Sequence, residues 1–247
     1  MICRLLVGHA NTDCLLAPGD EQGKSLSMED AVNEMLRRSE DLNEALFNRL
    51  GDSERDASVR GDAVVAICAA AFEHAAGLRL LIANGHMTPA LALMRLQYES
   101  LTRAMWLLYV APDSAIEKLT APLTIENERE AKGLPSQLAM LEQIRKGVGT
   151  KVPARAAEML EGFRKISWHS LNSYVHAGIH VIRRQADGYP VRLILDVLRN
   201  SNALSTMAAM TLALLTDEAT ARSVSRIQPA FADCLPELLA AQDVDPK

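Results

Sequence analysis

The sequence has few aromatic residues and no long uncharged apolar run, and both absences narrow the class of protein. Phe, Trp and Tyr make up 4% of the 247 residues. The longest apolar stretch, residues 63–83, is interrupted by Glu73, His74 and Arg79, whereas a membrane span needs about 20 consecutive apolar residues. We therefore expect a buried core helix at this stretch and no contact with a membrane.

The chain also lacks closely spaced cysteine pairs and an excess of positive charge. Cys3, Cys14, Cys68 and Cys234 include no C-x-x-C pair, so we expect reduced thiols and a cytoplasmic protein. The formal net charge of -5 argues against a general nucleic-acid binder, because clustered Lys and Arg drive binding to the phosphate backbone. Nucleic acid then remains a candidate partner only as an RNA substrate.

The residues that are abundant, above all Ala, Leu, Met, Glu and Arg, are strong helix formers and predict an all-α protein. Hydrophobic periodicity and capping signals predict an antiparallel helical bundle core of about four long helices. These long helices are expected at 54–83, 88–111, 165–186 and 191–216, with a further helix at 27–50 and short helices at 114–120, 123–132 and 136–146.

Residues 1–26 show no clean period and are expected to form a loosely ordered N-terminal arm. Residues 27–247 are expected to form a single helical-bundle domain. No repeat of fixed period is present, which argues against a solenoid.

A polar stripe interrupts the otherwise apolar helix at 88–111. Arg95, Glu99 and Arg103 follow one another at i, i+4 spacing, and Trp106 lies on the same side. That spacing lets Glu99 pair with both arginines, and buried charges are costly unless they are paired. The stripe is therefore either a structural ion-pair network or a network that leaves one arginine free to face an anionic ligand.

A second unusual stretch, SWHSLNSYVHAGIHVIRR at 167–184, repeats polar residues every three or four positions, as on one helical face. These residues are His169, Asn172, His176, His180 and Arg183. The i, i+4 spacing of His176 and His180 can chelate a metal, so a histidine-based metal-binding bundle is one alternative. No Glu-x-x-His pair accompanies them, and we expect no metal and no cofactor; the histidines would otherwise hydrogen-bond across the bundle or face solvent.

Arg164 and His169 have the Arg-x4-6-His spacing of HEPN-type helical ribonucleases, which the chain therefore weakly resembles. The resemblance implies metal-free RNA cleavage across a dimer, with His169 or His176 as the acid/base and Arg164 or Arg95 as the charge stabiliser. Arg4–His9 and Arg79–His86 fit the same spacing, and Lys follows Arg164 where that family favours Asn, Asp or His. The ribonuclease is thus an alternative rather than the main prediction.

Residues 92–111 and 173–184 together resemble bacterial helical proteins known only as domains of unknown function, in which an R-x3-E helix precedes an S-x-x-H helix. The resemblance covers about residues 60–215 and implies that Arg95, Glu99 and His176 belong to one site. We therefore expect a binding protein rather than an enzyme, with a polar pocket for a small anionic ligand, such as a phosphate or nucleotide, or for a protein partner. The expected ligand-binding residues are Arg95, Glu99, Arg103, Trp106, Asn172, His176 and His180.

The amphipathic pattern at 27–50 suggests how copies of the chain could associate. Its apolar positions recur at helical spacing, and such a face must be covered by the core or by a partner. We expect a homodimer, with this helix as one candidate interface.

Overall fold

The computed structural model describes residues 28–51, 53, 55 and 57–237, and the expected arm at 1–26 lies outside them. Apart from one isolated bridge between Val148 and Val152, the regular structure of the described residues is entirely helical. The predicted all-α fold is confirmed. The elements are α1 (Met28–Leu50), α2 (Val59–Ala83), α3 (Met87–Tyr109), α4 (Asp113–Thr120), α5 (Ile125–Ala131), α6 (Gln137–Lys146), α7 (Ala154–Val175), α8 (Ile179–Asp187), α9 (Val191–Ala213), α10 (Glu218–Ser225) and the 3-10 helix η1 (Gln228–Cys234).

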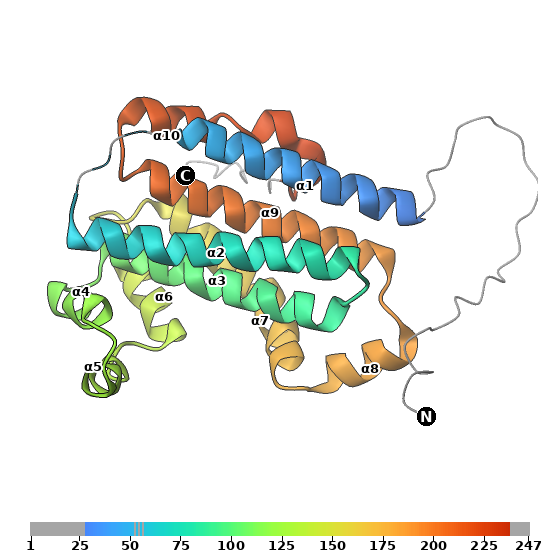
Figure 1. The fold of residues 1–247 in the computed structure, drawn as a ribbon, viewed down its shortest axis with the longest axis horizontal. Coiled ribbons are helices and arrows are strands. Elements are labelled where there is room, and N and C mark those ends of the chain that lie inside the picture. Colours follow the sequence, from blue (N-terminus) through green and yellow to red (C-terminus); the bar gives the residue numbers. More distant parts are fainter. Residues whose placement is uncertain (1–27, 52, 54, 56, 238–247) are drawn as a thin grey trace, which may run out of the picture.

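The helices α2 and α3 form an antiparallel hairpin at the centre of the fold (Figure 1). Ser58 begins α2, because its hydroxyl accepts the Gly61 N–H at 3.0 Å. The turn before α3 contains Gly85 at a φ of 76°, which glycine adopts without a steric cost. Close packing of the pair depends on small residues, since a Cβ added to Gly77 would lie 2.9 Å from Leu93 Cδ1.

By length and composition alone, α2 could cross a membrane, and it is the one helix of the described residues that could. Its packing shows a different role, because it contacts α3 along its length and α9 as well. Cys68, Ala75 and Leu78 are fully buried there. The structure thus agrees with the expected core helix at residues 63–83.

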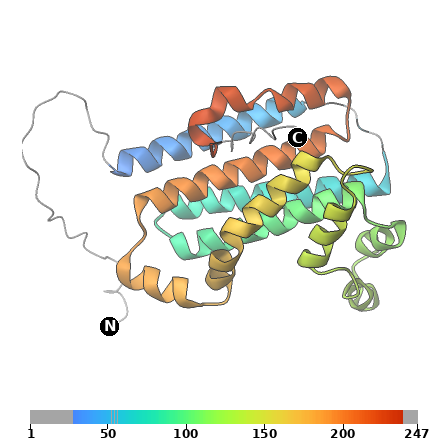
Figure 2. The same ribbon diagram turned by 180° about the vertical axis from the view of Figure 1, so that it is seen from behind.

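Four long helices lie in the order α1, α9, α2 and α3 in Figure 1, which confirms a helical bundle. The helix α2 runs opposite to the other three. The sequence predicted a different fourth member, residues 165–186, but the structure places α1 in the bundle instead. Residues 165–186 are divided between α7, which packs obliquely on α3 as seen from behind in Figure 2, and the separate helix α8.

The apolar face of α1 is covered within the chain. Met35, Leu42 and Leu46 are buried, and α1 packs against α9, α10 and η1. This apolar face is therefore taken up largely by the core, and removing α1 would expose α9; association through the exposed part of α1, where Phe47 is 46% exposed, stays a prediction.

A bidentate ion pair fastens η1 to α1. Arg38 donates from Nε to Asp233 Oδ2 at 2.6 Å and from Nη2 to Asp233 Oδ1 at 2.8 Å. These hydrogen bonds hold the pKa of the Asp233 carboxyl below its usual range. The ionised carboxylate therefore stabilises the folded chain.

This pair predicts a pH-dependent effect of Asp233→Asn. A carboxyl whose pKa is lowered by folding contributes stability above its unfolded pKa of about 3.9, and the contribution is lost as the pH falls through the folded pKa. At pH 7 we expect a lower melting temperature for Asp233→Asn than for wild type, and the difference should shrink below about pH 4. Thermal melts between pH 7 and pH 3 measure it, with the exposed Glu44→Gln as control; a difference that stays constant over this range would contradict the assignment.

Candidate functional site

The predicted contact between the polar stripe of α3 and the helix at 154–175 is present in the structure. Arg95 Nε donates to Glu99 Oε1 at 2.8 Å, and Arg95 Nη1 donates to Asn172 Oδ1 on α7. The guanidinium carbon also lies 4.5 Å from the ring centre of Trp168. Arg95 is thus fixed on three sides, and only 14% of its side chain is exposed.

Aromatic packing holds α7 against α3 beside this cluster. Tyr98 stacks on Phe163 at 4.7 Å between ring centres and meets Trp168 edge-on at 6.3 Å. The buried Tyr98 hydroxyl donates to the Leu160 carbonyl at 3.1 Å. Burial raises the pKa of Tyr98 to about 12, so this phenol remains a structural donor at neutral pH.

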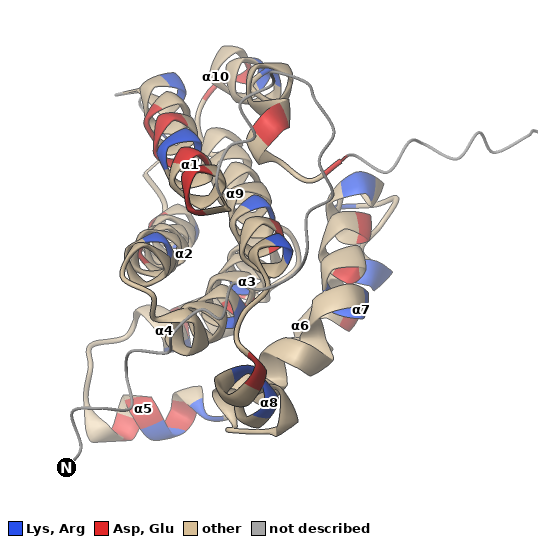
Figure 3. Ribbon diagram, turned by 90° about the vertical axis from the view of Figure 1, so that its right-hand side faces the viewer, with Lys and Arg blue, Asp and Glu red and all other residues tan. Residues whose placement is uncertain are grey.

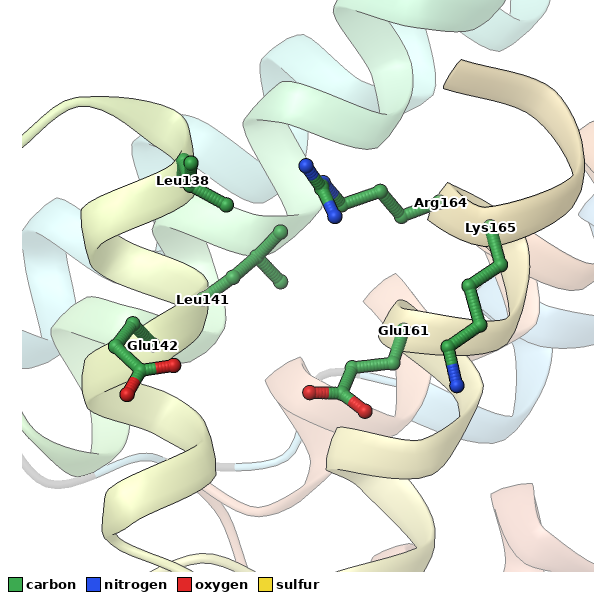
Figure 4. A pocket seen from close by; sticks show the side chains of 6 residues that line it. All are labelled: Leu138, Leu141, Glu142, Glu161, Arg164 and Lys165. Carbon is green, nitrogen blue, oxygen red and sulfur yellow. The ribbon is translucent and has the colours of Figure 1, made fainter. Parts of the chain in front are cut away.

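A groove lies between α6 and α7, close to the same tryptophan (Figure 4). Leu138, Leu141 and Glu142 line it from α6, and Glu161, Arg164 and Lys165 line it from α7. Figure 4 shows the Arg164 guanidinium extending from α7 across the groove toward α6. Sequence reasoning found Arg164 in this set and missed the other five residues, because the contact between α6 and α7 is not encoded in local spacing.

Arg164 is a half-buried cation of this groove, and within the part of the chain that the structure describes it has no ion pair and no hydrogen bond. Its one recorded contact is with Trp168, whose ring centre lies 5.9 Å from the guanidinium carbon. Lys165 and the Glu161 carboxylate, which line the same groove, have no ion pair there either. The Glu142 carboxylate is already paired, since Arg145 donates to it at 3.0 and 2.7 Å and keeps its pKa low.

The expected pairing of Glu99 with both arginines is wrong. Glu99 pairs with Arg95 alone, and Arg103 has no hydrogen bond or ion pair among the described residues. The Nε of Arg103 is buried without a partner. On α3, Arg95 is therefore paired and has a structural role. Arg103, one turn after Glu99, has a buried Nε without a hydrogen-bond partner.

Trp106 is a core residue that lies apart from the groove between α6 and α7, although it lines a second hollow together with Lys118 and Gln143. Its side chain is 0% exposed, and its Nε1 donates to Gln143 Oε1 on α6 at 2.6 Å. We expected Trp106 in a ligand pocket because it follows the polar stripe along α3. The tryptophan that meets the arginines is Trp168.

The histidines do not share one helical face, because the helix ends between them. α7 ends at Val175, His176 is its C-cap residue, and Ala177 adopts a φ of 51°. Gly178 then begins α8, and the His180 N–H donates to the Ser173 hydroxyl at 3.0 Å. A side chain at position 178 would lie 2.5 Å from that hydroxyl, so the chain passes close to Ser173 at this glycine.

The three candidate histidines consequently have different surroundings. His169 and His176 are exposed. His180 packs against Tyr174, with 5.9 Å between the ring centres, and its Nδ1 is buried without a hydrogen bond. No cluster of three or more His, Cys, Asp or Glu side chains suited to a metal occurs in the described part of the chain. Chelation by His176 and His180 at i, i+4 spacing requires both on one helix, whereas His176 caps α7 and His180 lies on α8.

Arg164 and His169 diverge on α7. Five residues correspond to a rotation of about 140° around an α-helix, so a half-buried Arg164 in the groove leaves His169 on the outer side. The structure shows His169 exposed in this way. One chain therefore does not bring the pair together on a common substrate.

The fold and this site define an all-α helical-bundle protein with an arginine-bearing groove on the α3 side of the bundle. Residues 68–237 match the family of unknown function DUF6988, and the chain belongs to that family. This agrees with the predicted likeness to helical proteins of unknown function. No curated protein and no solved structure matches the chain, so the R-x3-E and S-x-x-H motifs and the resemblance to HEPN-type ribonucleases stay predictions.

Proposed function

We propose that the groove between α6 and α7 binds a small anionic ligand, a carboxylate or a phosphate ester with an apolar portion. The observation that carries the proposal is the half-buried Arg164 guanidinium, which extends into the groove without an anionic partner among the described residues. A desolvated charge is costly unless it is paired. A bound anion would provide that pair.

The chemistry of arginine favours an anion with two oxygens that can accept hydrogen bonds side by side. The guanidinium is a rigid fork of donors that matches carboxylate and phosphate oxygens in two parallel hydrogen bonds. Trp168 lies beside it, and this contact limits the orientations of the guanidinium before a ligand arrives. Lys165 lies at the same wall and adds positive charge at the rim.

The opposite wall favours an apolar portion in the ligand. Leu138 and Leu141 project from α6 into the groove (Figure 4), and 58% of the Leu138 surface is exposed. Covering apolar surface contributes about 25 cal/mol per Å². A ligand that meets both walls would therefore bind better than inorganic phosphate.

Arg95 serves this site as a support. Its guanidinium already donates to Glu99 and Asn172 and packs on Trp168. We expected Arg95 to contact the ligand. Its contacts instead suit it to holding Trp168 in position. Arg164, outside the α3 stripe, is the arginine that we propose for the ligand, whereas the stripe itself leaves Arg103 without a partner among the described residues.

A thermal-shift titration with octanoate, benzoate, AMP and inorganic phosphate tests the proposal. Because a ligand that binds only the folded state raises its stability, at least one organic anion should raise the melting temperature of wild type and of Arg155→Gln, a matched exposed arginine on α7. Arg164→Gln should show no shift. An equal shift in Arg164→Gln, or no shift of wild type with any probe, would overturn the proposal.

Two additions sharpen this experiment. Leu138→Asn should weaken the effect of octanoate and leave that of inorganic phosphate unchanged, since only the apolar wall is altered. A short single-stranded RNA is included as a further probe. Its cleavage by wild type, lost in His169→Ala, would favour the ribonuclease over a non-catalytic binding protein.

A further inference from the structure

We infer that the α3 side of the bundle is a self-association surface, on which α5 of one copy meets α8 of a second copy of this chain. Two short helices project from this side of the four-helix stack, α5 at one end and α8 at the other (Figure 1). The view in Figure 3 places both on the same side as well. The inference is independent of the ligand proposed for the groove.

Packing within the chain contributes little to the stability of either helix. α5 has seven residues and α8 has nine, and neither contains a buried residue. α5 packs chiefly on α4, and α8 chiefly on α7. Isolated helices shorter than about 12 residues are marginal in water, and tertiary packing normally supplies their stability. A surface that covers both helices would supply it here.

Each helix also exposes large apolar side chains. Leu123 and Ile125 at the start of α5 are 95% and 65% exposed, and Ile179 and Ile182 on α8 are 69% and 66% exposed. Leu96 is partly exposed on α3 itself. Exposed apolar side chains on short projecting helices are surface that a partner can cover.

Charge complementarity identifies the occupant as a second copy. The helix α5 carries Glu126, Glu128 and Glu130 against a single arginine, and none of these glutamates has an ion pair within the described residues. The helix α8 (Figure 3) carries Arg183 and Arg184 against a single aspartate, which pairs with Arg183 at 2.9 Å and leaves Arg184 without an ion pair in the described residues. An acidic apolar face and a basic apolar face on one molecule complement each other between two molecules.

The positions of the two faces permit a closed dimer. A two-fold dimer formed through this side would place α8 of the second copy against α5 of the first. The same two-fold rotation brings the second α5 to the first α8, which is an isologous contact that forms no open chain. The partner would also cover the exposed surface of α3.

Charge exchange between the two helices tests the inference. Variant A carries Glu126→Arg and Glu130→Arg on α5, and variant B carries Arg183→Glu and Ala186→Glu on α8. Light scattering after size exclusion should give wild type twice the chain mass of 27.0 kDa, whereas A and B alone should each be monomers because like charges then face each other. An equimolar mixture of A and B should recover the dimer, since both contacts again join opposite charges.

Glu44→Arg is the matched control, an exposed glutamate on α1, on the far side of the stack, and it should remain dimeric. Circular dichroism of every variant checks that it is folded. A monomeric wild type, a dimeric A or B alone, or a mixture that stays monomeric would each overturn the inference.

Discussion

Replacing Trp106 with alanine is expected to lower the free energy of unfolding by about 3–5 kcal/mol, the range for removing a large aromatic side chain from a core. Trp106 is fully buried at the junction of α3 and α6, so its removal leaves a cavity that the helices cannot fill. It also removes the donor to Gln143. Chemical denaturation, followed by circular dichroism, measures the loss.

Trp168→Ala is the matched comparison, because the chain contains two tryptophans and this one is half-buried. The packing of Trp168 on Arg95 contributes less to stability than a fully buried tryptophan does. We therefore expect Trp168→Ala to lower the free energy of unfolding by about 1–2 kcal/mol. Trp168→Ala should in addition weaken the anion response of Arg164, whereas Trp106→Phe should preserve it. Equal losses for the two alanine variants would contradict the assignment of Trp106 to the core and of Trp168 to the site.

The difference between these tryptophans shows what local sequence can predict. The i, i+4 pair of Arg95 and Glu99 was predictable, because both partners lie on one helix whose geometry fixes their separation. The burial of Trp106 depends on Gln143, which is 37 residues away on α6. Helical spacing carries no information on which short helix docks there.

The helix break at residues 176–178 illustrates a second limit. Gly178 was a signal in the sequence, but an unbroken period of polar residues through His180 favoured one helix. The break requires Ala177 in a left-handed conformation, which costs about 1–2 kcal/mol for a residue with a Cβ. Contacts formed by the folded chain offset this cost, including the bond from the His180 N–H to Ser173.

The groove was the least predictable feature, although its key residue was named. Arg164 was a candidate through its spacing to His169, yet its neighbours in the structure are Leu138 and Leu141 from a different helix. The spacing therefore singled out the arginine of the groove for a reason that the geometry does not support. Arg103 also lacks an anionic partner in the described chain, and what distinguishes Arg164 is that it lacks one while lining a groove, which appears only once the helices are placed together.

The second large effect is expected at Asn202, in the interior between α9, α1 and η1. Asn202 is 2% exposed, and its Nδ2 donates to Ser39 Oγ at 2.8 Å and to the Cys234 carbonyl at 2.9 Å. Asn202→Leu keeps the branching and the number of side-chain heavy atoms but leaves both acceptors without this donor. Because a buried group without its partner costs about 1–3 kcal/mol, we expect a total loss of about 2–4 kcal/mol by chemical denaturation.

Asn200→Leu is the control for this substitution, because the Asn200 amide donates only to the Asp196 carbonyl within α9. We expect a loss below about 1 kcal/mol there, as for a surface position. Asn202→Leu should also release η1, so limited proteolysis should cut that variant after Arg226 sooner than wild type or Asn200→Leu. If the two substitutions have equal effects, Asn202 does not join the three elements, and the attachment of η1 must depend on the Arg38–Asp233 ion pair alone.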